Sequence, residues 1–249
     1  MTPAVEVRTS DGVAHLTLSR PERGNALGPD LVEAALEAVH RTLADGARMI
    51  VLRGAGKHFC TGFDLSDLAE LSDGDLLLRV IRIETLLQAV HHAPVPTIAV
   101  AHGATMGAGA DLVAACQMRW ALPGTRFAFP GAGFGLALGT RRLAFRIGSE
   151  AARDLVGSGR RIDASEAASL GLIQRMVDPD ALESEMVAAS RHYALDAATA
   201  ERVHALTVPD TRESDLANLA MSAARPGLKA RITSYVASLQ DRKAEGGKR

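Results

Sequence analysis

Two glycine-rich segments hold the residues whose types and spacing could do chemistry. One runs from Phe59 to Leu65 and the other from Gly103 to Asp111. Glycine lets a backbone turn tightly and lets a ligand approach the main chain closely. Peptide N–H groups at the start of a helix have no partner within that helix, and they carry the positive end of its dipole. Two such turns that face each other would offer two N–H donors to one oxygen, which is the geometry of an oxyanion hole.

Each segment taken alone also fits an ordinary connection between elements. Neither is a phosphate-binding loop of the Walker A type, because no Gly-Lys-Ser/Thr follows. The second segment has the spacing G-x-x-x-G-x-G, which differs from the dinucleotide fingerprint G-x-G-x-x-G. The two cysteines, Cys60 and Cys116, form no metal-binding pattern and no disulfide framework, so we expect reduced thiols and a cytoplasmic location.

The overall composition excludes several other classes of protein. The chain has 249 residues, of which 47% are hydrophobic and 23% charged, and its formal net charge is −1. These fractions are typical of globular proteins, and the balanced charge favours neither nucleic acid nor an anionic membrane as a partner. Residues 1–11 lack the basic start and apolar run of a signal peptide. The most apolar stretch, residues 95–116, is interrupted by glycines, His102 and Asp111, so we expect no membrane span.

The elements that must position the two segments alternate between strand and helix. A hairpin around residues 10–12 precedes a helical pattern with Asp30 as its candidate N-cap. Strands and helices then follow each other: strand 49–52, helix 76–90, strand 97–101, helix 107–116 and strand 117–122. The strand signals fade after residue 161, and residues 181–239 have a mainly helical pattern. This alternation predicts an α/β fold.

Four segments, in this order, resemble the motifs of the crotonase, or enoyl-CoA hydratase/isomerase, superfamily. They are Arg20–Leu27 (R-P-x-x-x-N-A-L), Gly54–Leu65 (G-x-G-x-x-F-x-x-G-x-D-L), Pro94–Leu112 (P-x-P-x-I-A-x-x-x-G-x-x-x-G-x-G-x-E/D-L) and Ala164–Ile173 (A-x-E-A-x-x-x-G-L-V). The resemblance implies a crotonase-like spiral of ββα turns over residues 1–180. It also implies a helical region over residues 181–249 that packs between the subunits of a homotrimer or a dimer of trimers.

The same resemblance implies an enzyme that processes acyl-CoA thioesters, as in fatty acid metabolism. Coenzyme A would be part of the substrate, with no separate cofactor and no metal. By position in the motifs, the N–H groups of Thr61 and Ala108 would hold the thioester oxygen of an enolate, and Asp111 would be the acid–base group. The loop expected to pass the adenine and pantetheine contains Lys57, His58, Cys60, Gly62 and Asp64, and Gly107 belongs to the second turn. Arg23, with Arg20, lies near that entry and could meet phosphates or be a solvated surface residue.

The sequence departs from the family pattern at the carboxylates. Hydratases of this family use two of them on either side of a water. Asp111 occupies the first position, where it is shorter than glutamate by about 1.5 Å, although the helix dipole alone also favours aspartate in a first turn. At the second position stands Gly131, and residues 131–139 contain no ionisable side chain. A positioned acid or base is worth about 10²–10⁴ in rate, and glycine here leaves room for a bulkier acyl group.

Several readings of the chemistry therefore stay open. The reaction could be hydration of an enoyl-CoA, or a double-bond shift that needs one base. The chain could instead bind acyl-CoA with weak catalysis or none, because Gly131 replaces the second carboxylate. Less favoured are a dehalogenase or lyase with a base from elsewhere, acid–base roles for His58 or His102, and a nucleophilic Cys60 thiolate.

Overall fold

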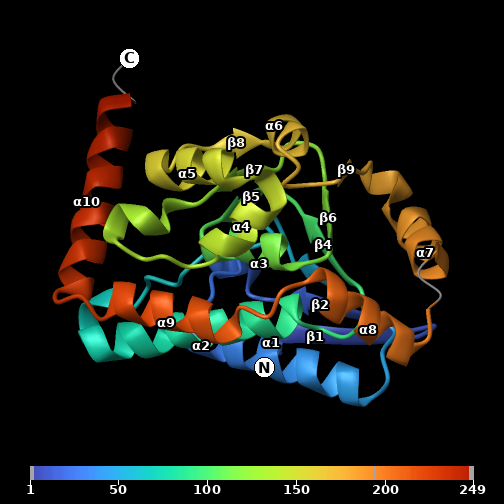
Figure 1. Cartoon of the computed structure of the whole chain (residues 1–249). Coiled ribbons are helices and arrows are strands. Elements are labelled where there is room, and N and C mark those ends of the chain that lie inside the picture. The colour runs from blue at the N-terminus through green and yellow to red at the C-terminus, as the bar shows by residue number, and fades with distance from the viewer. Residues whose placement is uncertain (1–2, 193–194, 247–249) are drawn as a thin grey trace.

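The computed structural model describes residues 3–192 and 195–246, and it confirms the predicted α/β fold. Most of the strands lie in one six-stranded sheet with the order β1-β2-β3-β4-β6-β9 (Figure 1). The strands are β1 (Val5–Ser10), β2 (Val13–Leu18), β3 (Met49–Gly54), β4 (Thr97–Ala101), β6 (Met118–Ala121) and β9 (Arg175–Met176). β1 and β2 form the predicted antiparallel hairpin, and every later pair in this sheet is parallel.

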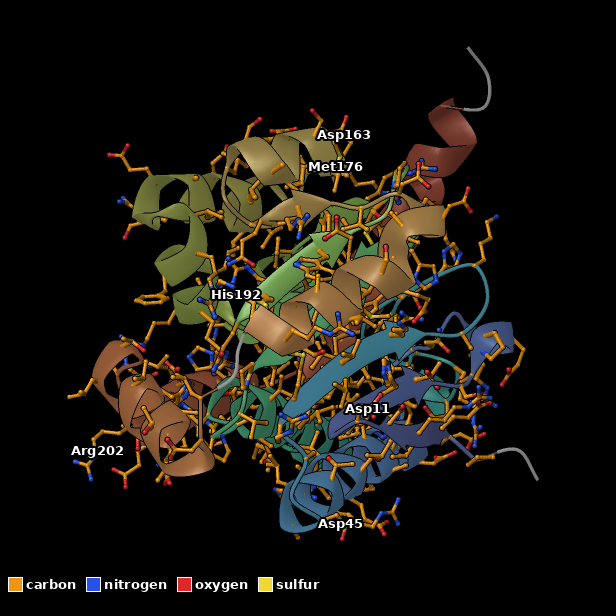
Figure 2. All side chains as sticks on the ribbon, turned by 90° about the vertical axis from the view of Figure 1, so that its right-hand side faces the viewer. Asp11, Asp45, Asp163, Met176, His192 and Arg202 are labelled. Atoms are coloured by element: carbon orange, nitrogen blue, oxygen red, sulfur yellow. The ribbon has the colours of Figure 1, made fainter. Side chains whose placement is uncertain are left out.

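Helices cover both faces of this sheet, because its central strands are apolar on both sides. Alternate residues such as Leu16, Ile50 and Leu52 share one core with the buried faces of α1 (Pro29–Ala44), α2 (Asp73–His91) and α3 (Ala108–Ala115). Residues of the opposite face, among them Val51 and Trp120, pack against α7 (Leu182–His192). Figure 2 shows α7 running across this face towards the labelled His192.

A second, three-stranded sheet carries the turn that leads into α3. Its strands are β5 (Ala104–Met106), β7 (Arg126–Ala128) and β8 (Ile162–Asp163), with β5 and β7 parallel and β8 antiparallel to β7. The sequence analysis did not predict this sheet, since strands of two or three residues show no period. It also missed α4 (Thr140–Ile147) and α5 (Ser149–Ser158), and the predicted late helix is α6 (Ala164–Ser169).

The rest of the chain is helical, as predicted. It contains α8 (Ala197–Thr207), α9 (Arg212–Ala223) and α10 (Leu228–Gly246), together with α7. In Figure 1, α9 lies across α2, and α10 stands at the left-hand side of the molecule. A third apolar cluster joins Leu76 and Val80 of α2 to Leu219 of α9 and Ile232 of α10. Short 3-10 turns complete the chain: η1 (Pro21–Arg23), η2 (Leu68–Glu70), η3 (Pro130–Phe134) and η4 (Pro179–Ala181).

Helix boundaries correct one detail of the sequence analysis. Asp30 is not the N-cap of α1, because the cap is Gly28 and Pro29 occupies the first helical turn. Proline at that position costs no hydrogen bond, since its missing N–H would have had no partner within the helix. A full capping box instead begins α2, where Ser72 and Asp75 bond each other's backbone N–H groups.

Asn25 ties the segment before α1 to the first glycine-rich segment. Its side chain is fully buried, its φ is +54°, and its Oδ1 accepts from the Arg20 N–H at 2.8 Å. Its Nδ2 donates to the carbonyls of Ala55 at 2.9 Å and His58 at 2.7 Å. A short polar side chain that tolerates positive φ therefore fixes the start of the loop that leads to Thr61.

We expect Asn25→Ala to lower the free energy of unfolding by about 3 kcal/mol, because three part-buried backbone groups lose hydrogen bonds worth about 1 kcal/mol each. The measurement is chemical denaturation. Asn218→Ala is the matched control, since Asn218 makes its bond on the exposed side of α9. A loss for Asn25→Ala no greater than that of the control would contradict this role.

Candidate active site

A cavity of about 280 Å³ lies where the two glycine-rich segments meet. Most of its wall is apolar, and α2, η3 and α10 contribute part of it, with Val80, Ile83 and Ile232 among the lining residues. Of the residues with predicted roles, those at the cavity wall are Thr61, Gly62, Gly107, Ala108, Asp111 and Gly131. The chain therefore brings both glycine turns and the predicted acid–base residue to one apolar hollow.

The two segments lie side by side because strand-like hydrogen bonds join them. The Met106 N–H donates to the Cys60 carbonyl at 2.9 Å, and Cys60 pairs with Thr105 as an isolated parallel bridge. Glycine is required at the contact itself. A Cβ on Gly62, whose φ is +98°, would lie 2.7 Å from the Met106 carbonyl oxygen, and a Cβ on Gly109 would overlap the Cys60 carbonyl.

The hydrogen bonds of the backbone correct the predicted pair of donors. The Thr61 N–H already donates to the Gly24 carbonyl at 3.0 Å, so it is not available to a ligand in this structure. The Phe63 N–H, two residues further on, has no acceptor among the described residues, and Phe63 also lines the cavity. Thr61 stays a wall residue, and the available donor of the first segment belongs to Phe63.

The Ala108 N–H is available as a donor in the second segment, and its role there stays a prediction. It is the first residue of α3, where an N–H has no partner within the helix, and no acceptor for it exists among the described residues. Gly107 precedes it with a φ of +53° and ψ of −127°, a conformation that L-residues rarely adopt. The position of a Cβ on Gly62 lies 3.6 Å from the Ala108 nitrogen, so the two turns are in contact.

Asp111 lies one turn along α3 from Ala108, as predicted, and its side chain is only 5% exposed. Burial raises the pKa of this carboxyl well above its ordinary value, while the charge of Arg142 lowers it and that of Glu84 raises it. Its Oδ1 has no hydrogen-bond partner among the described residues. Gly139 lies so close to this oxygen that a Cβ on Gly139 would overlap the Asp111 Oδ1. The carboxyl therefore lies desolvated beside the cavity, with its neutral form favoured by burial.

Gly131 occupies the wall of the same cavity, on η3. A Cβ built on it would meet its nearest neighbour, the Leu136 carbonyl oxygen, at 3.5 Å, which is an ordinary van der Waals contact. Its φ lies outside the left-handed region. A side chain would therefore fit at this position.

Of the residues predicted to pass coenzyme A, Gly62 lines this cavity, and Arg23, Lys57, His58, Cys60 and Asp64 lie outside it. Arg23 and Asp64 are joined by an ion pair of 3.4 Å and line a separate polar hollow. Lys57 is exposed, and His58 is half-buried with its Nδ1 bound to the Ala104 N–H at 3.0 Å. Their contact with coenzyme A stays a prediction.

Cys60 is fully buried behind the first turn. Burial raises the pKa of its thiol to about 12, which outweighs a hydrogen bond from the Gly62 N–H. A thiol is not a nucleophile until it ionises, so this environment argues against the nucleophilic thiolate that the sequence left open.

Sequence reasoning missed three polar groups of the site. One is the Phe63 N–H, which no side-chain pattern marks. The others are the side chains of Arg161 and Tyr235, which line the cavity from the segment before β8 and from α10. Arg161 lies next to β7 because it directly precedes β8, which pairs with β7. β8 has only two residues, so no periodicity in the sequence predicts it.

Comparison with known proteins defines the family. The family model for enoyl-CoA hydratase/isomerase matches residues 8–230. The chain therefore belongs to the enoyl-CoA hydratase/isomerase family, as the four motifs predicted.

Individual relatives agree with this assignment. A crystal structure of a putative enoyl-CoA hydratase/isomerase from Bordetella parapertussis is 42% identical and covers 95% of this chain and 99% of its own, with a TM-score of 0.93. A probable enoyl-CoA hydratase of Rhodobacter capsulatus is 36% identical over 76% of this chain and 75% of its own length. The mouse mitochondrial enoyl-CoA hydratase domain-containing protein 2 is 34% identical over 71% of this chain, which spans only 62% of that relative. The described residues include no helix long and apolar enough to cross a membrane.

The burial of both cysteines generates a direct prediction. Cys60 and Cys116 are buried, and burial raises the pKa of each thiol to about 12. We expect no reaction with a thiol-specific disulfide reagent at pH 8 in the folded protein, and reaction of both thiols once guanidinium unfolds it. Labelling of Cys60 at the rate of a free thiol in the folded protein would contradict this, with Cys60→Ala as the control that identifies the site.

Proposed function

We propose that this protein is an enzyme that moves a proton on an acyl-CoA thioester through an enolate. The Phe63 and Ala108 N–H groups hold the thioester oxygen, and Asp111 is the acid–base group. One observation carries the proposal: two main-chain donors without acceptors and a single buried carboxyl share one apolar cavity.

The chemistry follows from where charge develops. Removing a proton from the carbon beside a thioester carbonyl places negative charge on the carbonyl oxygen. Fixed N–H donors stabilise that charge without reorganising, and losing one of them costs about 10²–10³ in rate. The apolar wall excludes water, which strengthens these interactions.

A raised pKa suits the Asp111 carboxyl to this work. To accept a proton it must first ionise, and its raised pKa makes the resulting carboxylate a stronger base than an exposed aspartate. After taking the α proton, Asp111 is again a neutral acid that can return the proton to the γ carbon. A shift of a double bond needs no other acid, so we favour isomerisation over hydration.

The second candidate is a protein that binds acyl-CoA with weak catalysis or none. Gly131 favours it, since η3 supplies no second carboxyl to the cavity. Both candidates need the same donors for the thioester oxygen, and they differ only in whether Asp111 exchanges a proton with the bound acyl group.

We also propose that the protein assembles through its C-terminal helices, as the homotrimer implied by the family resemblance would require. Several apolar residues are exposed there, including Leu206 at 82% and Met221 at 64%. A cytoplasmic location stays a prediction of the sequence.

Proton exchange separates an enzyme from a binding protein. In deuterated water, we expect the protein to exchange the α protons of a saturated acyl-CoA such as butyryl-CoA. Asp111→Asn should lower this rate by about 10²–10⁴, because it removes the only base at the cavity while keeping its size. The measurement is proton NMR of the α-methylene signal.

Affinity for butyryl-CoA, measured by calorimetry, should change little in Asp111→Asn. Binding by the unsubstituted protein with no exchange above the buffer rate would contradict the enzyme and support the binding protein.

Installing the missing carboxyl tests the choice between isomerisation and hydration. We expect Gly131→Glu to fold, because a Cβ at this position meets only ordinary contacts. It should raise the rate of water addition to crotonyl-CoA by about 10²-fold or more, since a positioned base can then activate water. The loss of absorbance of the conjugated thioester measures this rate.

Gly131→Gln is the matched control, because it adds the same bulk without an acid. Rapid hydration by the unsubstituted protein, left unchanged by Gly131→Glu, would contradict the view that the second carboxyl is what hydration lacks.

A further inference from the structure

A buried ion pair lies on the two helices that flank α3. Glu84 of α2 is 1% exposed and Arg142 of α4 is 3% exposed, and the Arg142 Nη2 donates to the Glu84 Oε2. The other oxygen of Glu84 accepts from Gln88 at 2.9 Å. Asp215 of α9 lies 3.5 Å from the Arg142 Nη1, too far for a strong hydrogen bond. The guanidinium is thus anchored firmly at one nitrogen only.

This pair adjoins the candidate acid–base residue. α3 packs against both α2 and α4, so Glu84, Asp111 and Arg142 come from three helices in mutual contact. Gly139, which precedes α4, touches the Asp111 Oδ1, and Arg142 follows it by three residues. Among the described residues no hydrogen bond or ion pair joins Asp111 to Arg142, and Gly139 relates the two through its contact with Asp111 and its place at the start of α4.

Unpaired polar atoms on the two sides are complementary. Asp111 Oδ1 is a buried acceptor without a partner, and the Nε and Nη1 of Arg142 are buried donors without a hydrogen-bond acceptor, all judged among the described residues. An unmatched buried polar atom costs about 1–3 kcal/mol. Three such atoms lie in this region, so we expect a state of the protein in which they form hydrogen bonds.

Resting on the proposed function, we propose that Arg142 is the positioning residue for Asp111, and that its guanidinium turns an N–H group towards the Asp111 carboxylate whenever that group ionises. Glu84 holds the guanidinium in place and opposes this attraction with its own negative charge. The neutral form of Asp111 needs no such partner. Arg142 thus stabilises one of the two protonation states between which Asp111 must alternate.

The charges around Asp111 fix the sign of each effect. Burial has the largest effect and raises the pKa of Asp111; Arg142 on α4 lowers this pKa, and Glu84 on α2 raises it further. On the far side of Arg142, the carboxylate of Asp215 pairs with Arg141 at 2.6 Å. His91 on α2 also lies near Arg142, but burial lowers the pKa of His91 to about 3, so it adds no charge near neutral pH.

The test is a titration of the Asp111 carboxyl carbon by carbon-13 NMR, with Asp111→Asn identifying the signal. Glu84→Gln should lower the pKa of Asp111 and Arg142→Met should raise it, each by about 1 unit or more. Arg142→Lys should stay close to the unsubstituted protein, since the charge is kept. The low-pH limb of the α-proton exchange rate should move in the same directions, because the ionised form is the base.

Two further variants keep the test decisive if a single change prevents folding. Glu84→Gln with Arg142→Met removes both charges together and should leave the pKa between those of the single variants. Asp215→Asn leaves the buried pair intact and should lower the pKa of Asp111. Arg82→Gln is the control, because Arg82 pairs with Glu33 on the exposed side of α2 and should change nothing.

Opposite shifts for Glu84→Gln and Arg142→Met would support the proposal, since Arg142 would then stabilise the ionised form of Asp111 and Glu84 would oppose it. Shifts of the same sign, or none, would overturn it. The NMR titration needs no turnover, so an absence of exchange in the unsubstituted protein would refute the proposed function while the role of Arg142 is still decided.

Discussion

The architecture of the site depends on one close contact between two stretches of backbone. The Met106 N–H bonds the Cys60 carbonyl, and no Cβ fits at Gly62 or Gly109, so the two turns can touch only because both positions are glycine. This contact brings the Phe63 and Ala108 N–H groups to the wall of one cavity. A buried N–H without an acceptor is costly, and a site that binds an oxyanion is a reason for a fold to retain two of them.

The surrounding elements hold the two turns in place and enclose the cavity beside them in apolar side chains. The parallel strands β3 and β4 each lead into a glycine segment, and Asn25 fixes the loop between β3 and the first segment through the Ala55 and His58 carbonyls. α2, α9 and α10 enclose the apolar wall through the cluster that includes Leu76, Leu219 and Ile232. Asp111 then faces a cavity with few polar groups, and its protonation is governed by burial and by the charges of Arg142 and Glu84.

Much of this arrangement could be predicted from the sequence. The central strands and α2, α3 and α6 follow from their apolar periods, and the four motifs identified the family. The small sheet could not be predicted, because β8 has only two residues and its pairing with β7 is set by tertiary contacts. The donor of the first segment was also misplaced by two residues. Which amide is free depends on the Gly24 carbonyl that occupies Thr61, and no residue pattern reports that bond.

The proposed mechanism depends most on where the thioester oxygen binds. A crystal structure with a saturated acyl-CoA would locate it directly. We expect the carbonyl oxygen within about 3 Å of both the Phe63 and the Ala108 nitrogens, with the α carbon against the Asp111 carboxyl. An oxygen bound elsewhere in the cavity, or one that contacts neither nitrogen, would contradict the account.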